Sequence, residues 1–359
     1  MTLSAAEKKR YDRHLRLKDV GHKGQLKFKN ARVLVVGAGG LGCPALLYLT
    51  AAGVGTIGII DFDDVDESNL QRQVLFDIND IGENKAHAAK KKLSTQNPFI
   101  NFIVSDQKLT NKNAIKLFTD FDIILDGTDN FATRYLVNDA CVLLGKPLIY
   151  GAINKFEGQV SVFNYKEGPT YRCLFPVPPE PGSVRSCSDV GVLGILPGII
   201  GAHQANEALK IILGIGTTLS GRILVYNALE SSFTELALEK TTFQPAVSNE
   251  KELVEYNYDF FCGIETGIYN SISRVDFEAL TEETLVLDVR ESWEEPKVYN
   301  KKVLEIPLEE IPNNLKSIPS NEPVYVICQK GSRSASAISF LEKEYSFQNL
   351  INVSGGMIG

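Results

Sequence analysis

The chain has 359 residues, of which 44% are hydrophobic and 23% charged, a composition typical of a globular protein large enough for two domains. Its formal net charge of -7 argues against a general nucleic-acid or membrane-surface partner, because a polyanion would be repelled. No run of 18 apolar residues occurs, and the charged N-terminus has no apolar signal core. Six cysteines without a CxxC pair suit a reducing compartment, so we expect a cytoplasmic protein with mostly free thiols.

The first 63 residues predict a charged helix followed by a nucleotide-binding unit. The helix, at residues 4–18, has three arginines at three-residue spacing, including Arg13, which by spacing alone indicates a solvated face. In residues 32–63, two apolar runs flank a glycine turn, as in a strand, a helix and a second parallel strand. Such a turn lets backbone N–H groups approach a phosphate, and Asp61 stands where a carboxylate would take ribose hydroxyls. The glycines are Gly37, Gly39, Gly40 and Gly42.

The polar residues that follow favour a triphosphate over the nicotinamide dinucleotide to which the glycine turn alone points. Asn69 and Arg72 are three residues apart, so both could face the nucleotide, and an arginine fork suits a triphosphate. Lys85 begins a predicted helix, where a cation opposes the helix dipole, so either solvation or another interaction must compensate. Asp129 follows a predicted strand, at the edge where open sheets bind ligands, and a carboxylate there is most simply a magnesium ligand.

Nine short stretches occur in an order that carries a specific resemblance. They are RYDRHLRL, VLVVGAGGLGCP, DFDDVDESNLQRQ, GENKA, LDGTDN, TRYLVNDAC, FEGQVSVF, YRCLFP and GVLGILPGIIG. Over about residues 4–240 the chain resembles the MoeB/ThiF/HesA branch of the ubiquitin-activating-enzyme superfamily. The resemblance implies that the nucleotide is ATP and that the reaction is adenylation of the C-terminal glycine of a small ubiquitin-like sulfur carrier of the MoaD/ThiS type.

The same resemblance implies the nucleotide contacts. Gly40, Asp61 and Asp63 would hold the adenosine. The phosphates would be surrounded by Ser68, Asn69, Leu70, Gln71 and Arg72. Because a glycine carboxylate is already ionised at pH 7, we expect catalysis by positioning and charge neutralisation, without a general base.

Catalytic roles are implied for a smaller set. Arg72 and Lys85 would stabilise charge on the transferring α-phosphate and the departing pyrophosphate. Asp129, with Asn130 beside it, would bind magnesium. Arg13 matches an arginine that the family passes into the site of the other subunit, which implies a homodimer.

The cysteines depart from the family pattern at one place and match it at another. Many relatives bind zinc with two CxxC pairs, but here Thr170 replaces the first cysteine, Cys173 remains, and residues 241–247 contain none. A closed structural zinc site needs four ligands, so we expect no zinc. Cys187 matches a family cysteine that can form a thioester or acyl disulfide with the carrier, and an ordinary buried thiol is the alternative.

A second domain follows a polar segment that we interpret as a linker at residues 248–269. Cys328 ends a predicted strand and precedes a glycine-containing loop and a helix, the geometry of an anion-binding thiolate, and Arg333 adds positive charge. Together with DVRE and NVSGGM, this pattern resembles a rhodanese domain over about residues 270–359, in which Cys328 carries a persulfide cradled by residues 329–333. The EYxxGHI run that usually follows DVRE in rhodanese domains is not recognisable here. The chain stops just after the GG motif, so we expect a shortened domain or a truncated chain.

The prediction is therefore an α/β protein with a Rossmann-like nucleotide-binding domain of mixed sheet at residues 1–247 and a smaller α/β rhodanese domain at 270–359. It would adenylate a sulfur carrier with ATP and magnesium. Persulfide sulfur, received from a donor such as a cysteine desulfurase, would then give a thiocarboxylate. The pathway, whether molybdopterin, thiamine or tRNA thiolation, stays open. The alternatives are an NAD-dependent oxidoreductase and a non-catalytic nucleotide-binding scaffold with a degenerate rhodanese.

Overall fold

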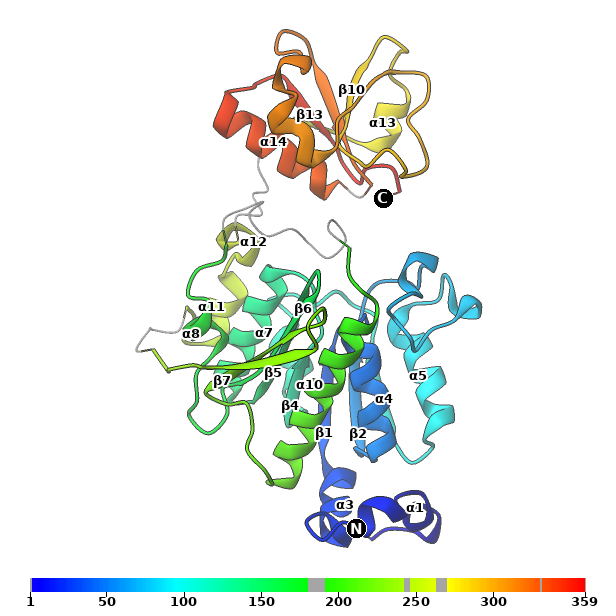
Figure 1. Ribbon diagram of the computed structural model, residues 1–359, viewed down its shortest axis with the longest axis vertical. Coiled ribbons are helices and arrows are strands. Elements are labelled where there is room, and N and C mark those ends of the chain that lie inside the picture. Colours follow the sequence, from blue (N-terminus) through cyan, green and yellow to red (C-terminus); the bar gives the residue numbers. More distant parts are fainter. Residues whose placement is uncertain (1, 180–190, 242–245, 263–269, 330, 359) are drawn as a thin grey trace. The chain divides into compact units, whose positions relative to one another are not determined.

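The computed structural model describes residues 2–179, 191–241, 246–262, 270–329 and 331–358, which form two compact units (Figure 1). The first unit ends at Cys262, and the second comprises the described residues from 270 onward. None of the described helices is long and apolar enough to cross a bilayer.

An eight-stranded mixed sheet forms the centre of the first unit, in the order β3-β2-β1-β4-β5-β6-β7-β8. Pairing is parallel from β3 to β5 and antiparallel from β5 to β8. This confirms the Rossmann-like domain with a mixed sheet that the sequence predicts. The strands are β1 (Arg32–Val36), β2 (Thr56–Ile60), β3 (Asn101–Ser105), β4 (Ile123–Asp126), β5 (Leu148–Asn154), β6 (Glu157–Phe163), β7 (Arg222–Asn227) and β8 (Ser232–Ala237).

Helices cover both faces of this sheet because its central strands are apolar on both sides. In β1, Val33 and Val35 face one core, with α4, α5 and α10, while Leu34 and Val36 face the other, with α6 and α7. The helices of these two layers are α4 (Gly42–Ala52), α5 (Lys85–Gln96), α6 (Ala114–Phe118), α7 (Phe131–Leu144), α8 (Tyr171–Leu174) and α10 (Ile195–Leu213). Two short 3₁₀ turns, η1 (Glu67–Asn69) and η2 (Ile78–Asp80), lie between β2 and α5.

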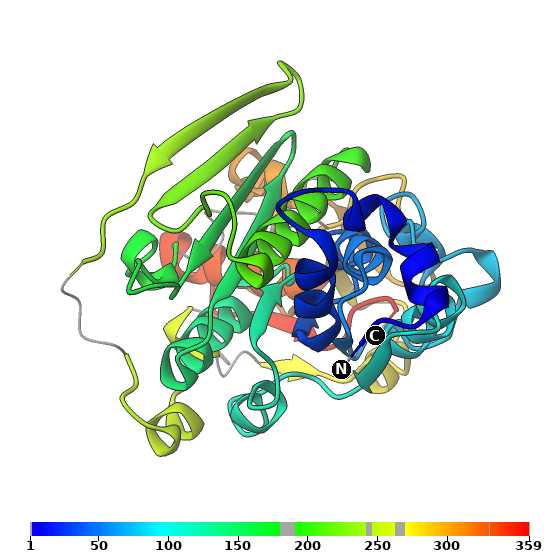
Figure 2. The same cartoon turned by 90° about the horizontal axis from the view of Figure 1, so that it is seen from below.

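The N-terminal helices lie at the end of the sheet where the parallel strands begin (Figure 1). They are α1 (Ala5–Arg10), α2 (Asp12–Leu15) and α3 (Gly21–Asn30), so the single helix predicted over residues 4–18 is divided in two. Arg10 donates to the carbonyl of Gln96 at the end of α5 (2.9 Å), which ties α1 to this edge. Figure 2 looks onto these helices from below.

The described part of the predicted linker, residues 248–262, is packed rather than extended. It forms α11 (Glu250–Glu255) and α12 (Tyr258–Phe261), which lie against α7. Arg172 makes a bidentate ion pair with Asp139 (2.8 and 2.7 Å), and Tyr258 donates its hydroxyl to the same carboxylate (2.9 Å). The aromatic rings of this segment are large enough to bury against α7, which a polar composition does not reveal. Residues 263–269 lie outside the described residues.

The second unit is a five-stranded parallel sheet in the order β11-β10-β12-β13-β9. One face packs against α14 and η3, and the other packs against α13. This is the smaller α/β domain that the sequence predicts. Its elements are β9 (Ser271–Ile272), α13 (Arg274–Glu278), β10 (Leu285–Asp288), β11 (Lys302–Glu305), η3 (Leu308–Asn313), η4 (Leu315–Ser317), β12 (Val324–Ile327), α14 (Ser332–Tyr345) and β13 (Leu350–Val353).

Candidate functional site

The glycine turn lies at the carboxyl end of β1, between strands whose connections leave in opposite directions. Such a switch point is where open parallel sheets bind ligands. Gly37 has φ +92, and a methyl group built on it would lie 2.8 Å from the carbonyl oxygen of Gly127. A methyl group on Gly42 would overlap the carbonyl oxygen of Gly37. Both positions therefore require glycine for the chain to pass between β1, β4 and α4.

The turn presents backbone donors that the described part of the chain leaves without acceptors. The Ala38 N–H donates to Asp61 (2.7 Å), and the Gly37 N–H donates to Ile60 (2.8 Å). For residues 39–42, at the start of α4, no acceptor of the N–H groups is found among the described residues, and no side chain caps this helix. Open N–H groups at a helix N-terminus attract an anion, so the turn can hold a phosphate.

Asp61 is held on this turn at the carboxyl end of β2. It is 9% exposed, and its two carboxylate oxygens accept the N–H groups of Ala38 (2.7 Å) and Asp63 (3.0 Å). Burial raises the pKa of Asp61 above its ordinary value, and the positive charge of Lys85 partly offsets this. The sequence assigns this carboxylate to the ribose hydroxyls of a nucleotide, and that role stays a prediction.

Lys85 lies next to this carboxylate and is 6% exposed. Its Nζ pairs with Asp63 Oδ2 at 3.0 Å, and its N–H donates to the Asp63 carbonyl (2.9 Å). The preceding residue, Asn84, caps α5 and also donates to the carbonyls of Asp61 and Asp63 (both 3.1 Å). The carboxylates of Asp61 and Asp63 therefore compensate for the unfavourable position of a lysine at a helix start, and solvation does not.

The phosphate segment predicted at residues 68–72 begins within η1 and reaches the glycine turn through Arg72. Asp66 caps η1 by accepting the Ser68 N–H (2.9 Å). Arg72 Nη1 donates to the Ser68 carbonyl (2.9 Å), and the Arg72 Cγ lies 3.7 Å from a methyl group built on Gly40. Asn69 is half-buried beside Ser68, with 3.5 Å between Nδ2 and Oγ.

The other two residues of this segment differ in their surroundings. Leu70 is half-buried against the apolar core, whereas Gln71 is exposed. A methyl group built on Gly194 would overlap the Gln71 carbonyl, so this segment touches the start of α10.

Two aspartates at the end of β4 have different roles. Asp126 is 1% exposed and accepts the N–H (2.8 Å) and hydroxyl (2.6 Å) of Thr128, and burial raises its pKa. Arg134 donates to the Thr128 carbonyl (3.1 Å), so Asp126 and Arg134 together fix the backbone that follows β4. Asp129 and Asn130 are exposed at the same edge. The Asn130 side chain caps α7 by accepting the Thr133 N–H (2.9 Å), which leaves Asp129 as the open carboxylate.

Arg13 is the one predicted contact that lies apart from this site. It is exposed on α2, at the amino ends of the strands. The five residues of β1 alone separate that edge from the glycine turn by about 16 Å. Its assignment to a neighbouring subunit's site stays a prediction.

Of the two cysteines that the family pattern singles out in the first unit, the structure describes Cys173. Cys173 Sγ accepts the Thr170 N–H (3.3 Å) and lies 3.5 Å from the Thr170 hydroxyl. Burial raises the pKa of Cys173, but hydrogen bonds with Thr170 and Thr241 outweigh it and lower the pKa below its ordinary value. In the described ranges, no three His, Cys, Asp or Glu side chains gather to hold a metal. The hydroxyls of Thr170 and Thr241, which lie around Cys173, are poor zinc ligands. Cys187 lies outside the described residues.

Cys328 forms a second centre at the carboxyl end of β12. Its side chain is buried, its Sγ accepts the Gly331 N–H (3.0 Å), and the Ser334 hydroxyl lies at 3.4 Å. Gly331 has φ +91 and lies against the terminal GG motif, with its built methyl group 3.1 Å from the Gly355 N. The Met357 N–H donates to the Cys328 carbonyl (2.9 Å), so this motif closes one side of the loop.

Arg333 is positioned by a partner that sequence reasoning missed. Its guanidinium makes two bonds to the Glu294 carboxylate (2.6 and 2.7 Å). Burial raises the pKa of Glu294, but Arg333 outweighs it, so the carboxylate is held ionised. The positive charge expected to serve the sulfur is thus opposed by a carboxylate three residues after DVRE. No pattern in the chain marks this pairing.

The DVRE segment also holds the cysteine loop. Arg290 is buried, pairs with Asp288 (2.7 Å), and donates to the Gln329 side chain (3.0 Å). The Gln329 amide in turn donates to the Glu295 carbonyl (3.0 Å). The loop therefore rests on charged and amide groups that keep the Gly331 N–H directed at the sulfur.

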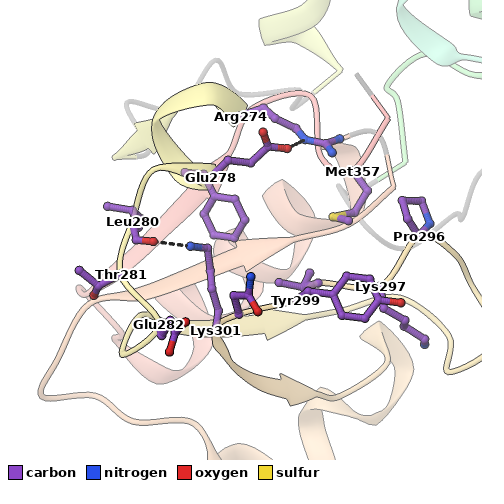
Figure 3. A pocket seen from close by; sticks show the side chains of 13 residues that line it. Arg274, Glu278, Leu280, Thr281, Glu282, Pro296, Lys297, Tyr299, Lys301 and Met357 are labelled. Carbon is purple, nitrogen blue, oxygen red and sulfur yellow. Dashed lines mark hydrogen bonds and ion pairs between the residues drawn. The ribbon is translucent and has the colours of Figure 1, made fainter.

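A pocket of about 570 Å³ lies on the α13 side of the same unit (Figure 3). The three cations that line it are already engaged: Arg274 pairs with Glu278 (2.8 Å), Lys297 donates to the Ser292 carbonyl (2.6 Å), and Lys301 donates to the Leu280 carbonyl (2.8 Å). Met357 connects the pocket wall to the cysteine loop. The pocket itself brings no further reactive group to Cys328.

Comparisons with known proteins agree with this two-part organisation. The ThiF family model matches residues 11–246, and the model of the rhodanese-like domain matches residues 274–359. A probable adenylyltransferase/sulfurtransferase MoeZ from Mycobacterium tuberculosis is 43% identical, over 99% of this chain and 93% of its own. A sulfur carrier protein adenylyltransferase from Thermus thermophilus is 48% identical, over 74% of this chain and all of its own.

A third relative and the solved structures complete the comparison. An adenylyltransferase and sulfurtransferase MOCS3 from Aedes aegypti is 38% identical, over 97% of this chain and 85% of its own. Escherichia coli MccB has the same fold, with a TM-score of 0.59 and 23% identity over 66% of this chain and 74% of that one. These matches confirm the resemblance drawn from the motifs. The chain belongs to the ThiF family and carries a rhodanese-like domain C-terminal to its adenylating domain.

Proposed function

We propose that this protein uses ATP to adenylate the C-terminal glycine of a small ubiquitin-like sulfur carrier and then delivers persulfide sulfur from Cys328 to that carbonyl. One observation carries the proposal. The open N–H groups of the glycine turn, the buried Lys85 and the half-buried Arg72 meet at one end of the sheet, in a chain that also holds a thiol in an anion loop. Relatives matched over nearly the whole chain are named for both activities, which supports the same conclusion.

In the first step, a carboxylate oxygen of the carrier attacks the α-phosphorus of ATP and the bond to pyrophosphate breaks. Asp61 orients the ribose, while the glycine turn receives the phosphates. Arg72 and Lys85 neutralise negative charge that grows on the departing pyrophosphate. Asp129, exposed at the end of β4 with Asn130 beside it, is the residue that would hold magnesium, which supplies further charge neutralisation when bound.

In the second step, the terminal sulfur of a Cys328 persulfide attacks the activated carbonyl and AMP leaves, giving an acyl disulfide. The Gly331 N–H, 3.0 Å from Sγ, stabilises negative charge in the loop. A thiol must then attack the Cys328 sulfur to release the thiocarboxylate, and we assign this to Cys187. The resulting disulfide is reduced by an external dithiol.

The assembly and supply of sulfur complete the proposal. Because Arg13 lies at the far edge of its own sheet, it can serve a nucleotide only in a homodimer. A protein persulfide donor, such as a cysteine desulfurase, would load Cys328. We place this chemistry in the cytoplasm, with an adenylating domain at residues 1–247 and a rhodanese domain at residues 270–359.

The test is ATP–pyrophosphate exchange with a MoaD- or ThiS-type carrier ending in glycine, followed by mass spectrometry of the carrier. We expect carrier-dependent exchange and, with a persulfide donor, a thiocarboxylate. Cys328→Ala should keep the exchange and lose the thiocarboxylate. ATP binding without exchange would favour a scaffold, and nicotinamide reduction would favour an oxidoreductase; either result contradicts the proposal.

A further inference from the structure

A buried glutamine beside the glycine turn has a hydrogen-bonding group that the fold does not use. Gln73 is 4% exposed, and within the described part of the chain no donor reaches its buried Oε1. An unmade bond of this kind destabilises the folded state, and most buried polar groups in native proteins are paired. The position therefore calls for a reason other than stability.

A second buried glutamine shows what a structural role looks like in this fold. Gln25 donates from Nε2 to the Ala52 carbonyl (2.8 Å), and its Oε1 lies 3.0 Å from His14 Nδ1. Both ends of that carboxamide are paired, as expected for a residue that serves packing alone. Like Gln73, Gln204 has a buried Oε1 without a donor among the described residues, but its Nε2 donates to the carbonyls of Asp126 (2.7 Å) and Ile149 (3.3 Å). Gln73 differs from both Gln25 and Gln204, because among the described residues neither end of its carboxamide has a partner.

The backbone fixes Gln73 over the turn. Its N–H donates to the Asn69 carbonyl (2.9 Å), and its carbonyl accepts the Phe76 N–H (3.0 Å). The atom nearest to a methyl group built on Gly39 is Gln73 Nε2, at 3.8 Å. On the neighbouring Gly40, the corresponding group would lie 3.7 Å from Arg72 Cγ. Consecutive side chains thus flank consecutive glycines of the turn.

The end of the carboxamide that faces the turn is its donor end. It lies next to Gly39, the first of residues 39–42, whose N–H groups have no acceptor among the described residues. Several donors directed at one space, with a cationic arginine next to them, are complementary to the oxygens of a phosphate. A carboxamide acceptor turned to the same space would repel those oxygens.

We propose that Gln73 is a further nucleotide-binding residue, whose Nε2 donates to a phosphate oxygen of the ATP held on the glycine turn. This inference rests on the proposed function, because it takes ATP as the nucleotide. It extends the phosphate-binding segment by one residue beyond Arg72. It gives a function to a buried carboxamide that makes no side-chain hydrogen bond among the described residues.

Two substitutions and one matched control test the proposal by isothermal titration with ATP and Mg²⁺ and, separately, with adenosine. Gln73→Met keeps the size and removes both polar groups. We expect it to weaken ATP binding about 10- to 100-fold and to leave adenosine binding unchanged. The melting temperature should stay the same or rise, since the unpaired oxygen is gone. Gln73→Glu should weaken ATP binding further, because a carboxylate would face the phosphate.

Gln96 supplies the control. Its Oε1 is also buried without a donor, but it lies at the last residue of α5, at the other end of the sheet. Gln96→Met should affect stability as Gln73→Met does and leave ATP binding unchanged.

Three outcomes would overturn the inference. They are wild-type ATP affinity in both Gln73 variants, an equal loss of ATP and adenosine binding, and a fall in melting temperature that accounts for the weaker binding. If Gln73→Met does not fold, the isosteric Gln73→Glu decides the question. Failure of the wild-type protein to bind ATP would instead overturn the proposed function, and this inference with it.

Discussion

Removal of the Lys85 charge gives the most direct test of the nucleotide site. The side chain is 6% exposed and pairs with Asp63, so water screens its charge poorly. A unit charge about 4 Å from a developing anion contributes about 4 kcal/mol at an effective dielectric constant of about 20, or roughly a thousandfold in rate. Lys85→Met should therefore lower kcat for ATP–pyrophosphate exchange by about 10²- to 10³-fold. Lys85→Arg should retain part of the activity.

The same substitution should change the pH dependence of ATP binding. Burial raises the pKa of Asp61, and the charge of Lys85 opposes that rise. Binding that needs ionised Asp61 is lost as the pH falls through this raised pKa. Without Lys85 the pKa rises further, so the loss of ATP affinity should begin at a higher pH in Lys85→Met, as measured by titration calorimetry across a pH series.

Lys91→Met is the matched control, because Lys91 is an exposed lysine of the same helix, paired with Glu83 (3.0 Å). It should leave both exchange and its pH dependence unchanged. The reasoning fails if Lys85→Met keeps more than a tenth of the exchange rate, or if Lys91→Met loses as much.

Three further predictions concern assembly, metal content and stability. Arg13→Ala should abolish exchange, and mixing it with Lys85→Met should restore about a quarter of the wild-type sites, because half of the dimers then contain one intact site; no recovery would exclude a shared site. Elemental analysis of purified protein should find far less than one zinc per chain, and stoichiometric zinc would contradict this. Arg172→Leu should destabilise the first unit by about 3–5 kcal/mol in denaturant unfolding, because Asp139 is left buried without its positively charged partner. Replacing both with leucine should recover most of that loss, and a single variant as stable as wild type would refute it.

Local patterns determined much of this protein because their causes are local. The apolar runs of β1, β2, β4 and β12 are buried strands in the structure, since only a covered parallel sheet accepts such runs. The glycine turn is recognisable because Gly37 and Gly42 occupy positions that a Cβ atom cannot enter. Cys328 lies at a strand end followed by a loop and a helix, as its flanking residues predict.

Some contacts could not be predicted from the sequence, because the residues that form them are far apart in the chain. Glu294 reaches Arg333 across 39 positions, and Tyr258 reaches Asp139 across 119. No composition or spacing rule connects such pairs. The sequence therefore predicts a linker for the aromatic segment that carries Tyr258, although that segment packs against α7.

The proposed nucleotide site divides in the same way. From the sequence alone come the glycine turn, Asp61 and the basic residues, since each is marked by its own neighbours along the chain. Only the tertiary structure decides that Lys85 is compensated by Asp63, and that Asp126 is support while Asp129 stays open. These outcomes depend on burial and on which donors and acceptors remain unpaired, and both are properties of the packed chain.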